Sequence, residues 1–221
     1  MNEFVKIVEV GPRDGLQNEK TPLTLDDRRK LILDLMQTGL SAIEVGSCVS
    51  AKWVPQMAQS DELFASLPKD PNISFSLLTP NLKGFESALA VGCQEVAVFT
   101  AASESFTQKN INCSIDESFE KFADIMTAAK AHNIKVRGYV SCIVDCPYEG
   151  AIAPSKVAHV SQRLLDMGCY EVPLGETIGT ATPDRVKKVW QACVAEMDAA
   201  SLAGHIHNTY CMAIAKFFQS L

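Results

Sequence analysis

Short apolar runs alternate with longer helix-like stretches along the whole chain. The runs are rich in β-branched residues and nearly continuous, which is typical of strands buried on both faces of a parallel sheet. No low-complexity linker interrupts the pattern, so we expect a single domain over residues 1–221. The alternation predicts an α/β fold. We expect strands at residues 5–10, 42–46, 73–79, 95–100, 135–141, 170–175 and 202–207.

Start signals mark the stretches between these runs as helices. Thr24 stands where an N-cap is expected, and Ser114 with Glu117 has the spacing of a capping box. Thr182 precedes Pro183, and proline is favoured in the first turn of a helix. A helix after each strand is the arrangement expected of repeated βα units.

Two architectures fit this repeat, the doubly wound open sheet and the (β/α)8 barrel. The segment after the first predicted strand reads "GPRDGLQNE". A dinucleotide-binding domain would carry G-x-G-x-x-G at this point. Its absence from this segment counts against a dinucleotide-binding fold.

The composition limits the classes of partner. The net charge is −6, and 47% of the 221 residues are hydrophobic, so the chain can bury a sizeable core. Nucleic-acid binding needs a basic face, which an acidic chain does not favour. No apolar run reaches the ~18 residues of a membrane span. We therefore expect a protein that binds neither nucleic acid nor a membrane.

The eight cysteines indicate a reducing compartment. They are scattered without paired C-x-x-C spacing, which argues against a zinc site and for reduced thiols. The first residues, "MNEFVKIVEV", lack the basic and apolar regions of a signal peptide. We expect a cytoplasmic protein.

Polar residues gather where the predicted strands end. In a parallel barrel, the carboxyl ends of all strands share one face, and active sites are built on that face. Acids, a cation and two histidines from distant parts of the sequence would meet there: Arg13, Asp14, Glu44, Glu176, His205 and His207.

The segment "HIHN" is the sharpest local feature. Residues two apart on a strand point the same way, so His205 and His207 share a side. Two imidazoles and an aspartate from another strand end would hold one divalent ion with positions left for substrate. The alternative is two histidines on a polar edge strand. Their place at a strand end favours the metal.

Arg13 and Asp14 have two interpretations. The tripeptide Arg13-Asp14-Gly15 is good turn chemistry, with Gly15 supplying a positive φ. Glu44, however, lies within an apolar strand, and a buried acid is costly without a partner. Either Arg13 pairs with Glu44 structurally, or both face the site, and these two readings are compatible.

Several longer motifs occur together and in order. They include "VEVGPRDGLQNE", "GSCVSAKWVPQM", "LTPNLKGFE", "RGYVSC", "CPYEG" and "MGCYE". With them, the chain closely resembles the 3-hydroxy-3-methylglutaryl-CoA lyase family, from about residue 5 to residue 210. The resemblance implies a (β/α)8 barrel and a divalent cation, Mg²⁺ or Mn²⁺. It also implies a small acyl-CoA substrate, cleaved to acetyl-CoA and acetoacetate in leucine breakdown and ketone-body formation. Members of the family are commonly homodimers.

The resemblance also assigns residues to roles. It implies that Asp14, His205 and His207 are metal ligands and that Arg13 is the catalytic cation. The base that removes the substrate's hydroxyl proton would be His205 or the acid at Glu176.

Further residues would support this site. The resemblance implies that Glu44 holds the site in place and that Gln17 lies near the substrate. Coenzyme A carries phosphates that need cations. Lys109, with Asn110 beside it, is the candidate for that contact, and a solvated loop lysine is the alternative.

The chain departs from the family pattern in four places. The chain stops at Leu221, after about seven predicted strands, and a closed barrel needs eight. The family's "TYGQALAN" reads "TYCMAIAKFFQSL" here, which looks like a frameshift or premature stop. Glu176 replaces the aspartate of the family's "LGDTIG", and Asn208 stands where many members have aspartate. We expect an incomplete barrel with unpaired strand edges, weak metal binding and low lyase activity.

Two other functions remain open at this point. One is an inactive remnant of the lyase, and the other is a related acyl-CoA condensing enzyme. The motifs "GPRDGLQNE" and "VPQM" favour the lyase over the condensing enzyme.

Overall fold

The computed structural model describes residues 5–220. Contacts within the chain divide it into two compact units, and each is described by itself. Unit 1 comprises Met1–Ala97 with Lys130–Lys135, and unit 2 comprises Val98–Ala129 with Val136–Leu221. The single domain expected over residues 1–221 stays a prediction.

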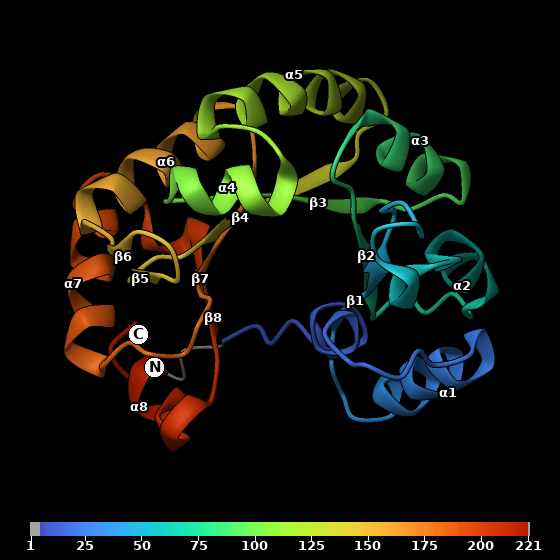
Figure 1. Ribbon diagram of the computed structural model, residues 1–221. Helices are drawn as coiled ribbons and strands as arrows, with labels where there is room; N and C mark the ends of the chain where they lie inside the picture. Colours follow the sequence, from blue (N-terminus) through green and yellow to red (C-terminus); the bar gives the residue numbers. More distant parts are fainter. Residues whose placement is uncertain (1–4, 221) are drawn as a thin grey trace. The chain divides into compact units, whose positions relative to one another are not determined.

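Unit 1 begins with a single π-helical turn and continues in βα units (Figure 1). Strand β1 pairs in parallel with β2, and β2 pairs in parallel with β3. The elements are η1 (Gly11–Gly15), α1 (Leu25–Met36), β1 (Ala42–Ser47), η2 (Pro55–Met57), α2 (Ser60–Ser66), β2 (Ser74–Leu78), α3 (Leu82–Ala90) and the start of β3 (Glu95–Ala101).

Unit 2 holds the rest of β3 and the later βα units. Strand β7 pairs in parallel with β4 and with β8. The elements are α4 (Glu104–Ile111), most of α5 (Ile115–Ala131), β4 (Lys135–Ser141), β5 (Asp145–Cys146), β6 (Gly150–Ala151), α6 (Pro154–Asp166), β7 (Val172–Glu176), α7 (Pro183–Val194), η3 (Ala199–Ser201), β8 (Leu202–Ile206), η4 (Thr209–Cys211) and α8 (Ala213–Phe217).

Six of the predicted strands are confirmed, in the order β1-β2-β3-β4-β7-β8. The predicted strand at residues 5–10 is wrong, because this segment makes only an isolated bridge between Glu9 and Ile43. Two backbone hydrogen bonds form the bridge, from Glu9 N–H to the Ala42 carbonyl and from Glu44 N–H to the Glu9 carbonyl. Val5 and Ile7 are 57% and 65% exposed. A segment that neither continues its ladder nor buries its apolar side chains is not held as a strand.

The predicted helix starts are confirmed. Thr24 caps α1 by accepting a hydrogen bond from Asp27 N–H at 3.1 Å. Ser114 and Glu117 bond reciprocally before α5, at 2.7 and 3.1 Å, as a capping box does. Helix α7 begins at Pro183. Local sequence therefore fixes where these helices begin.

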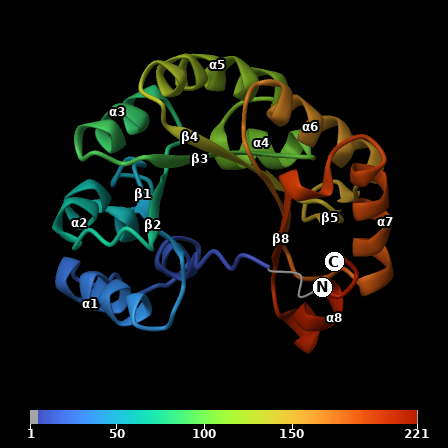
Figure 2. The same cartoon turned by 180° about the vertical axis from the view of Figure 1, so that it is seen from behind.

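The last helix packs within unit 2. Figure 2 shows α8 following β8, with α7 beside it, and contacts join α8 to both elements. Through these contacts, the segment after η4 belongs to the folded unit. Among residues 5–220, no helix has the length and apolar character needed to span a bilayer.

Candidate active site

Arg13 lies in η1, directly after the bridge at Glu9. The N–H groups of Arg13 and Asp14 both donate to the Val10 carbonyl, at 3.1 and 2.7 Å. The segment thus winds as one helical turn, and Gly15 lies inside it without a positive φ. The expected reverse turn with a left-handed glycine is therefore wrong. Backbone bonds to Val10 turn the chain instead.

Arg13 and Glu44 form a buried ion pair. Glu44 is 0% exposed in the middle of β1, and its Oε1 accepts a hydrogen bond from Arg13 Nε. A second nitrogen of Arg13, Nη1, donates to Asp14 Oδ1 at 2.8 Å. The structural pairing expected for the buried acid is confirmed. Two carboxylates bind one guanidinium, so its plane is held in a fixed orientation.

Gln17 follows η1 and is half-buried. It therefore belongs to the same segment of unit 1 as Arg13 and Asp14.

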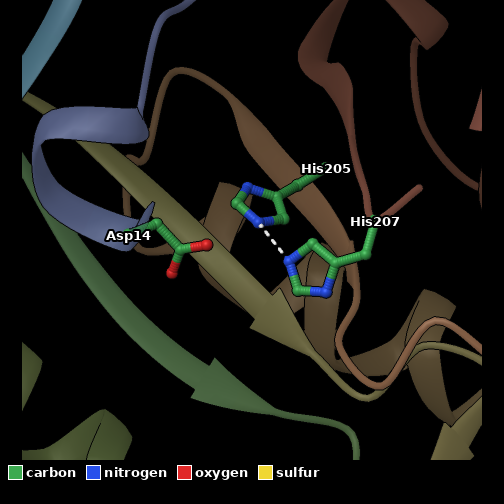
Figure 3. A group of neighbouring side chains, drawn as sticks. All are labelled: Asp14, His205 and His207. Atoms are coloured by element: carbon green, nitrogen blue, oxygen red, sulfur yellow. Dashed lines mark hydrogen bonds between the residues drawn. The ribbon is translucent and has the colours of Figure 1, made fainter. Parts of the chain in front are cut away.

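His205 and His207 lie together at the end of β8. Their Nε2 atoms are 3.3 Å apart, and their ring centroids are 5.3 Å apart (Figure 3). The prediction that the two imidazoles share a side is confirmed. The ring of Tyr139, on β4, meets that of His205 edge-on at 6.0 Å. Both histidines are half-buried.

A backbone carbonyl determines the tautomer of His207. Nδ1 of His207 lies 2.8 Å from the carbonyl oxygen of Thr177. A carbonyl only accepts, so Nδ1 carries the proton and Nε2 keeps its lone pair. A histidine that ligates a metal through Nε2 usually has its other nitrogen held in this way.

Glu176 ends β7 with both carboxylate oxygens occupied. Oε1 accepts from the Ala181 N–H at 2.9 Å, and Oε2 accepts from the Lys216 ammonium at 2.7 Å. The two side chains are 1% and 0% exposed. Sequence reasoning missed Lys216. A single lysine within the apolar run "MAIAKFF" was the available signal, because a lysine on the buried face of a helix needs a partner.

Lys109 and Asn110 lie on α4, and both are exposed. The Lys109 ammonium stands over the ring of Tyr148, 4.4 Å from its centroid. This residue is therefore on a helix rather than in a loop. The contact with Tyr148 holds its charge near the β5–β6 hairpin of unit 2.

The candidate ligands come from both units. Asp14 belongs to unit 1, and the two histidines belong to unit 2. Figure 3 labels all three side chains.

Comparisons with known proteins identify the family. The family described as HMGL-like matches residues 4–221. A hydroxymethylglutaryl-CoA lyase from Pseudomonas mevalonii is 53% identical over 219 residues, which are 99% of this chain and 73% of the relative. The match to the family reaches the final residues, including the segment that departs from "TYGQALAN".

Solved structures show the same likeness. The crystal structure of hydroxymethylglutaryl-CoA lyase from Pseudomonas aeruginosa has a TM-score of 0.95 and 52% identity, covering 98% of this chain and 72% of that one. An HMG-CoA lyase from Acinetobacter baumannii, in complex with coenzyme A and 3-methylmalate, has a TM-score of 0.94 and 30% identity, covering 100% of this chain and 73% of that one. The predicted barrel-type fold with incomplete strand number is confirmed. The chain belongs to the HMGL-like family of carbon–carbon lyases.

Proposed function

We propose that this chain cleaves 3-hydroxy-3-methylglutaryl-CoA to acetyl-CoA and acetoacetate. The observation that carries the proposal is 53% identity to a hydroxymethylglutaryl-CoA lyase over 99% of the chain. The residues described above have the chemistry that such a cleavage needs. The cleavage needs a cation that stabilises the enolate, side chains that bind a divalent ion, and a base that removes the hydroxyl proton.

Asp14, His205 and His207 would hold Mg²⁺ or Mn²⁺. They are the group of His, Cys, Asp or Glu residues within the described part of the chain that could hold an ion. The Nδ1 proton of His207 points to Thr177, which leaves Nε2 for a metal. Two imidazoles and a carboxylate suit first-row divalent ions and leave positions open. When bound, the ion would polarise the oxygens of the substrate and lower the pKa of its hydroxyl group.

Arg13 would stabilise the charge that develops on the thioester. When the C–C bond breaks, its electron pair passes to the thioester as an enolate, and the other fragment becomes the ketone of acetoacetate. A guanidinium stays protonated and donates in a fixed fork, so it can bind the enolate oxygen. The ion pair with Glu44 would hold the fork in place. Protonation of the enolate carbon then gives acetyl-CoA.

His205 is the better of the two candidate bases. The base must take the proton of the substrate's tertiary hydroxyl group. Both oxygens of Glu176 already accept hydrogen bonds, one of them from a buried ammonium. Protonating Glu176 would leave Lys216 as a buried charge without its counter-ion. We therefore assign a positioning role to Glu176 and proton removal to His205, which would bind the ion through one ring nitrogen and take the proton on the other.

The remaining substrate contacts are proposed on chemistry and position. Gln17 would donate from its amide to a substrate oxygen near Arg13. Lys109 and Asn110, exposed on α4, would meet the phosphates of coenzyme A.

We also propose a cytoplasmic homodimer. All eight cysteines carry free thiols, which suits a reducing compartment. Gel filtration with light scattering measures the oligomeric state.

The test is acetoacetate release by the purified chain with Mn²⁺ and a thiol reductant. We expect metal-dependent release that Asp14→Ala abolishes. A folded chain that releases no acetoacetate at any Mn²⁺ concentration would contradict the proposal and would favour a non-catalytic remnant.

A further inference from the structure

Lys216 is a fully buried cation at the C-terminal end of the chain. It lies in α8 with 0% of its side chain exposed. Its ammonium donates to Glu176 Oε2 at 2.7 Å and to the Gly179 carbonyl at 3.2 Å. Burying a lysine is costly unless the charge is paired. The pairing therefore fixes α8 to the turn that follows β7.

Lys216 and Glu176 hold this turn from both sides. Glu176 reaches across it, because its Oε1 accepts from the Ala181 N–H at 2.9 Å. Lys216 adds the bond to Gly179, whose φ of +75° allows the chain to reverse there. Two hydrogen bonds, one to each side chain, therefore close the backbone between Glu176 and Ala181, and the ion pair joins the two side chains.

Thr177 lies inside this turn and orients His207. Its Oγ1 accepts from the Cys142 N–H at 2.8 Å, which ties it to the end of β4. Its carbonyl accepts from His207 Nδ1–H, also at 2.8 Å. A continuous set of contacts therefore runs from Lys216, through the turn, to the ring of His207.

We propose that Lys216 is a positioning residue of the active site, acting through Glu176 and the turn on the ring of His207. The inference rests on the proposed function in that His207 serves as a metal ligand. Glu176 and Lys216 also stand at two of the positions where the chain differs from "LGDTIG" and "TYGQALAN". The structure joins these two differences in one ion pair, so the longer acid and the lysine function together.

The direct test compares Lys216→Met with Lys188→Met. Lys188 is an exposed lysine on α7 that pairs with Asp184, and it serves as the matched control. Imidazole ¹⁵N NMR reports the tautomer of His207, assigned by comparison with His207→Gln. We expect Lys216→Met to change His207 from the Nδ1–H form to a mixture and to weaken Mn²⁺ binding ~10–100-fold. Lys188→Met should change neither. A folded Lys216→Met chain with the wild-type tautomer overturns the inference.

A double-mutant cycle with Glu176→Gln separates positioning from general stability. If Lys216 acts through Glu176, the effects of the two substitutions on the His207 tautomer are not additive. Additive effects overturn the inference. If Lys216→Met does not fold, the neutral pair Glu176→Gln/Lys216→Met removes the orphaned charge, and its His207 spectrum decides in the same way.

Failure of this inference differs from failure of the proposed function. The tautomer of His207 does not depend on whether the chain cleaves an acyl-CoA. No acetoacetate release together with a changed His207 in Lys216→Met rejects the function and supports the positioning role. Release together with an unchanged His207 rejects the positioning role alone.

Discussion

The guanidinium of Arg13 donates to two carboxylates, those of Glu44 and Asp14, which differ in burial. Glu44 is fully buried, whereas the side chain of Asp14 is 27% exposed. The inner carboxylate fixes the orientation of the fork, and the outer one is the proposed metal ligand. Adjacency in the sequence would therefore set a short, constant separation between the proposed catalytic cation and a bound ion.

We predict that Arg13→Lys lowers kcat ~10²–10³-fold, because an ammonium cannot bind Glu44 and an enolate oxygen as a fork does. The measurement is the rate of acetoacetate release at saturating Mn²⁺. Arg29→Lys is the control, since Arg29 lies on α1 and donates to the carbonyl of Ser66. A wild-type kcat in Arg13→Lys would show that charge alone suffices.

The surroundings of Cys146 lower the pKa of its thiol. Burial by itself raises the pKa of its thiol, but hydrogen bonds from Ser103 Oγ and from backbone N–H groups outweigh burial and lower that pKa below its ordinary value. The Ser103 hydroxyl donates to the sulfur at 3.0 Å, and the Tyr148 N–H donates at 3.3 Å. Burial instead raises the pKa of Cys142 to about 12.

We therefore predict that Ser103→Ala raises the pKa of Cys146. The thiolate absorbance at 240 nm, taken as the difference from Cys146→Ser, measures it against pH. The stabilisation from a lowered pKa is present above the unfolded value and is lost as pH falls through the folded value. Ser103→Ala should reduce the stability gained on raising the pH through this range. An unchanged titration would mean that the backbone donors alone set the pKa.

At the scale of elements, the turn after β7 depends on one glycine. Gly179 has φ +75°, and an added Cβ would lie 1.8 Å from Thr209 Oγ1. Gly92 has a similar φ of +78°, but its Cβ would meet nothing within 4 Å. A side chain at position 92 would therefore meet backbone strain alone, whereas one at position 179 would meet the same strain and a steric clash.

We predict that Gly179→Ala destabilises the fold more than Gly92→Ala. Gly92→Ala should cost about 1–2 kcal/mol in the free energy of unfolding, from the left-handed backbone alone. The clash with Thr209 should add about 1–3 kcal/mol in Gly179→Ala. Urea denaturation monitored by circular dichroism measures both. Equal losses would mean that Thr209 moves away without cost.

The elements also show what the sequence could predict. Local signals predicted the starts of α1, α5 and α7, because a cap bonds within its own first turn. The strand predicted at residues 5–10 is wrong, because a strand needs a paired neighbour and this segment makes only an isolated bridge. Burial of Glu44 predicted its pairing with Arg13, since an acid in an apolar strand needs a cation.

Other parts of the site had no local signal. The pairing of Lys216 with Glu176 joins residues 40 positions apart. The bond from His207 to the Thr177 carbonyl involves a backbone acceptor, which no residue type reveals. Spacing predicted that His205 and His207 share a side, but only the fold shows which tautomer His207 adopts.

At the scale of the whole molecule, the proposed ligands come from opposite ends of the strand order. Asp14 precedes β1, and the histidines end β8, and β1 and β8 are the outermost strands of the order in residues 5–220. A closed barrel of this class has eight strands. The chain spans 73% of the length of its Pseudomonas mevalonii relative.

We therefore predict that the 221-residue chain alone binds Mn²⁺ more weakly than micromolar, because strands at the ends of the sheet order have a full strand partner on one side only and hold their side chains less firmly. Calorimetric titration measures the affinity, with Asp14→Ala as the control. Micromolar or tighter binding that the control abolishes would show that the six strands suffice to assemble the site.

The buried pair of Glu176 and Lys216 limits how this chain can be recombined with its relatives. A chimera that inherits the loop after β7 from one parent and α8 from the other would receive half of the pair. With asparagine at 216 from the relative, Glu176 would be buried as a lone carboxylate, with a loss of about 3–5 kcal/mol in stability. Glu176→Asp, which restores the residue of the "LGDTIG" pattern, would shorten the reach to Lys216 by one methylene. In a library of such chimeras, the residues at positions 176 and 216 should therefore always come from the same parent.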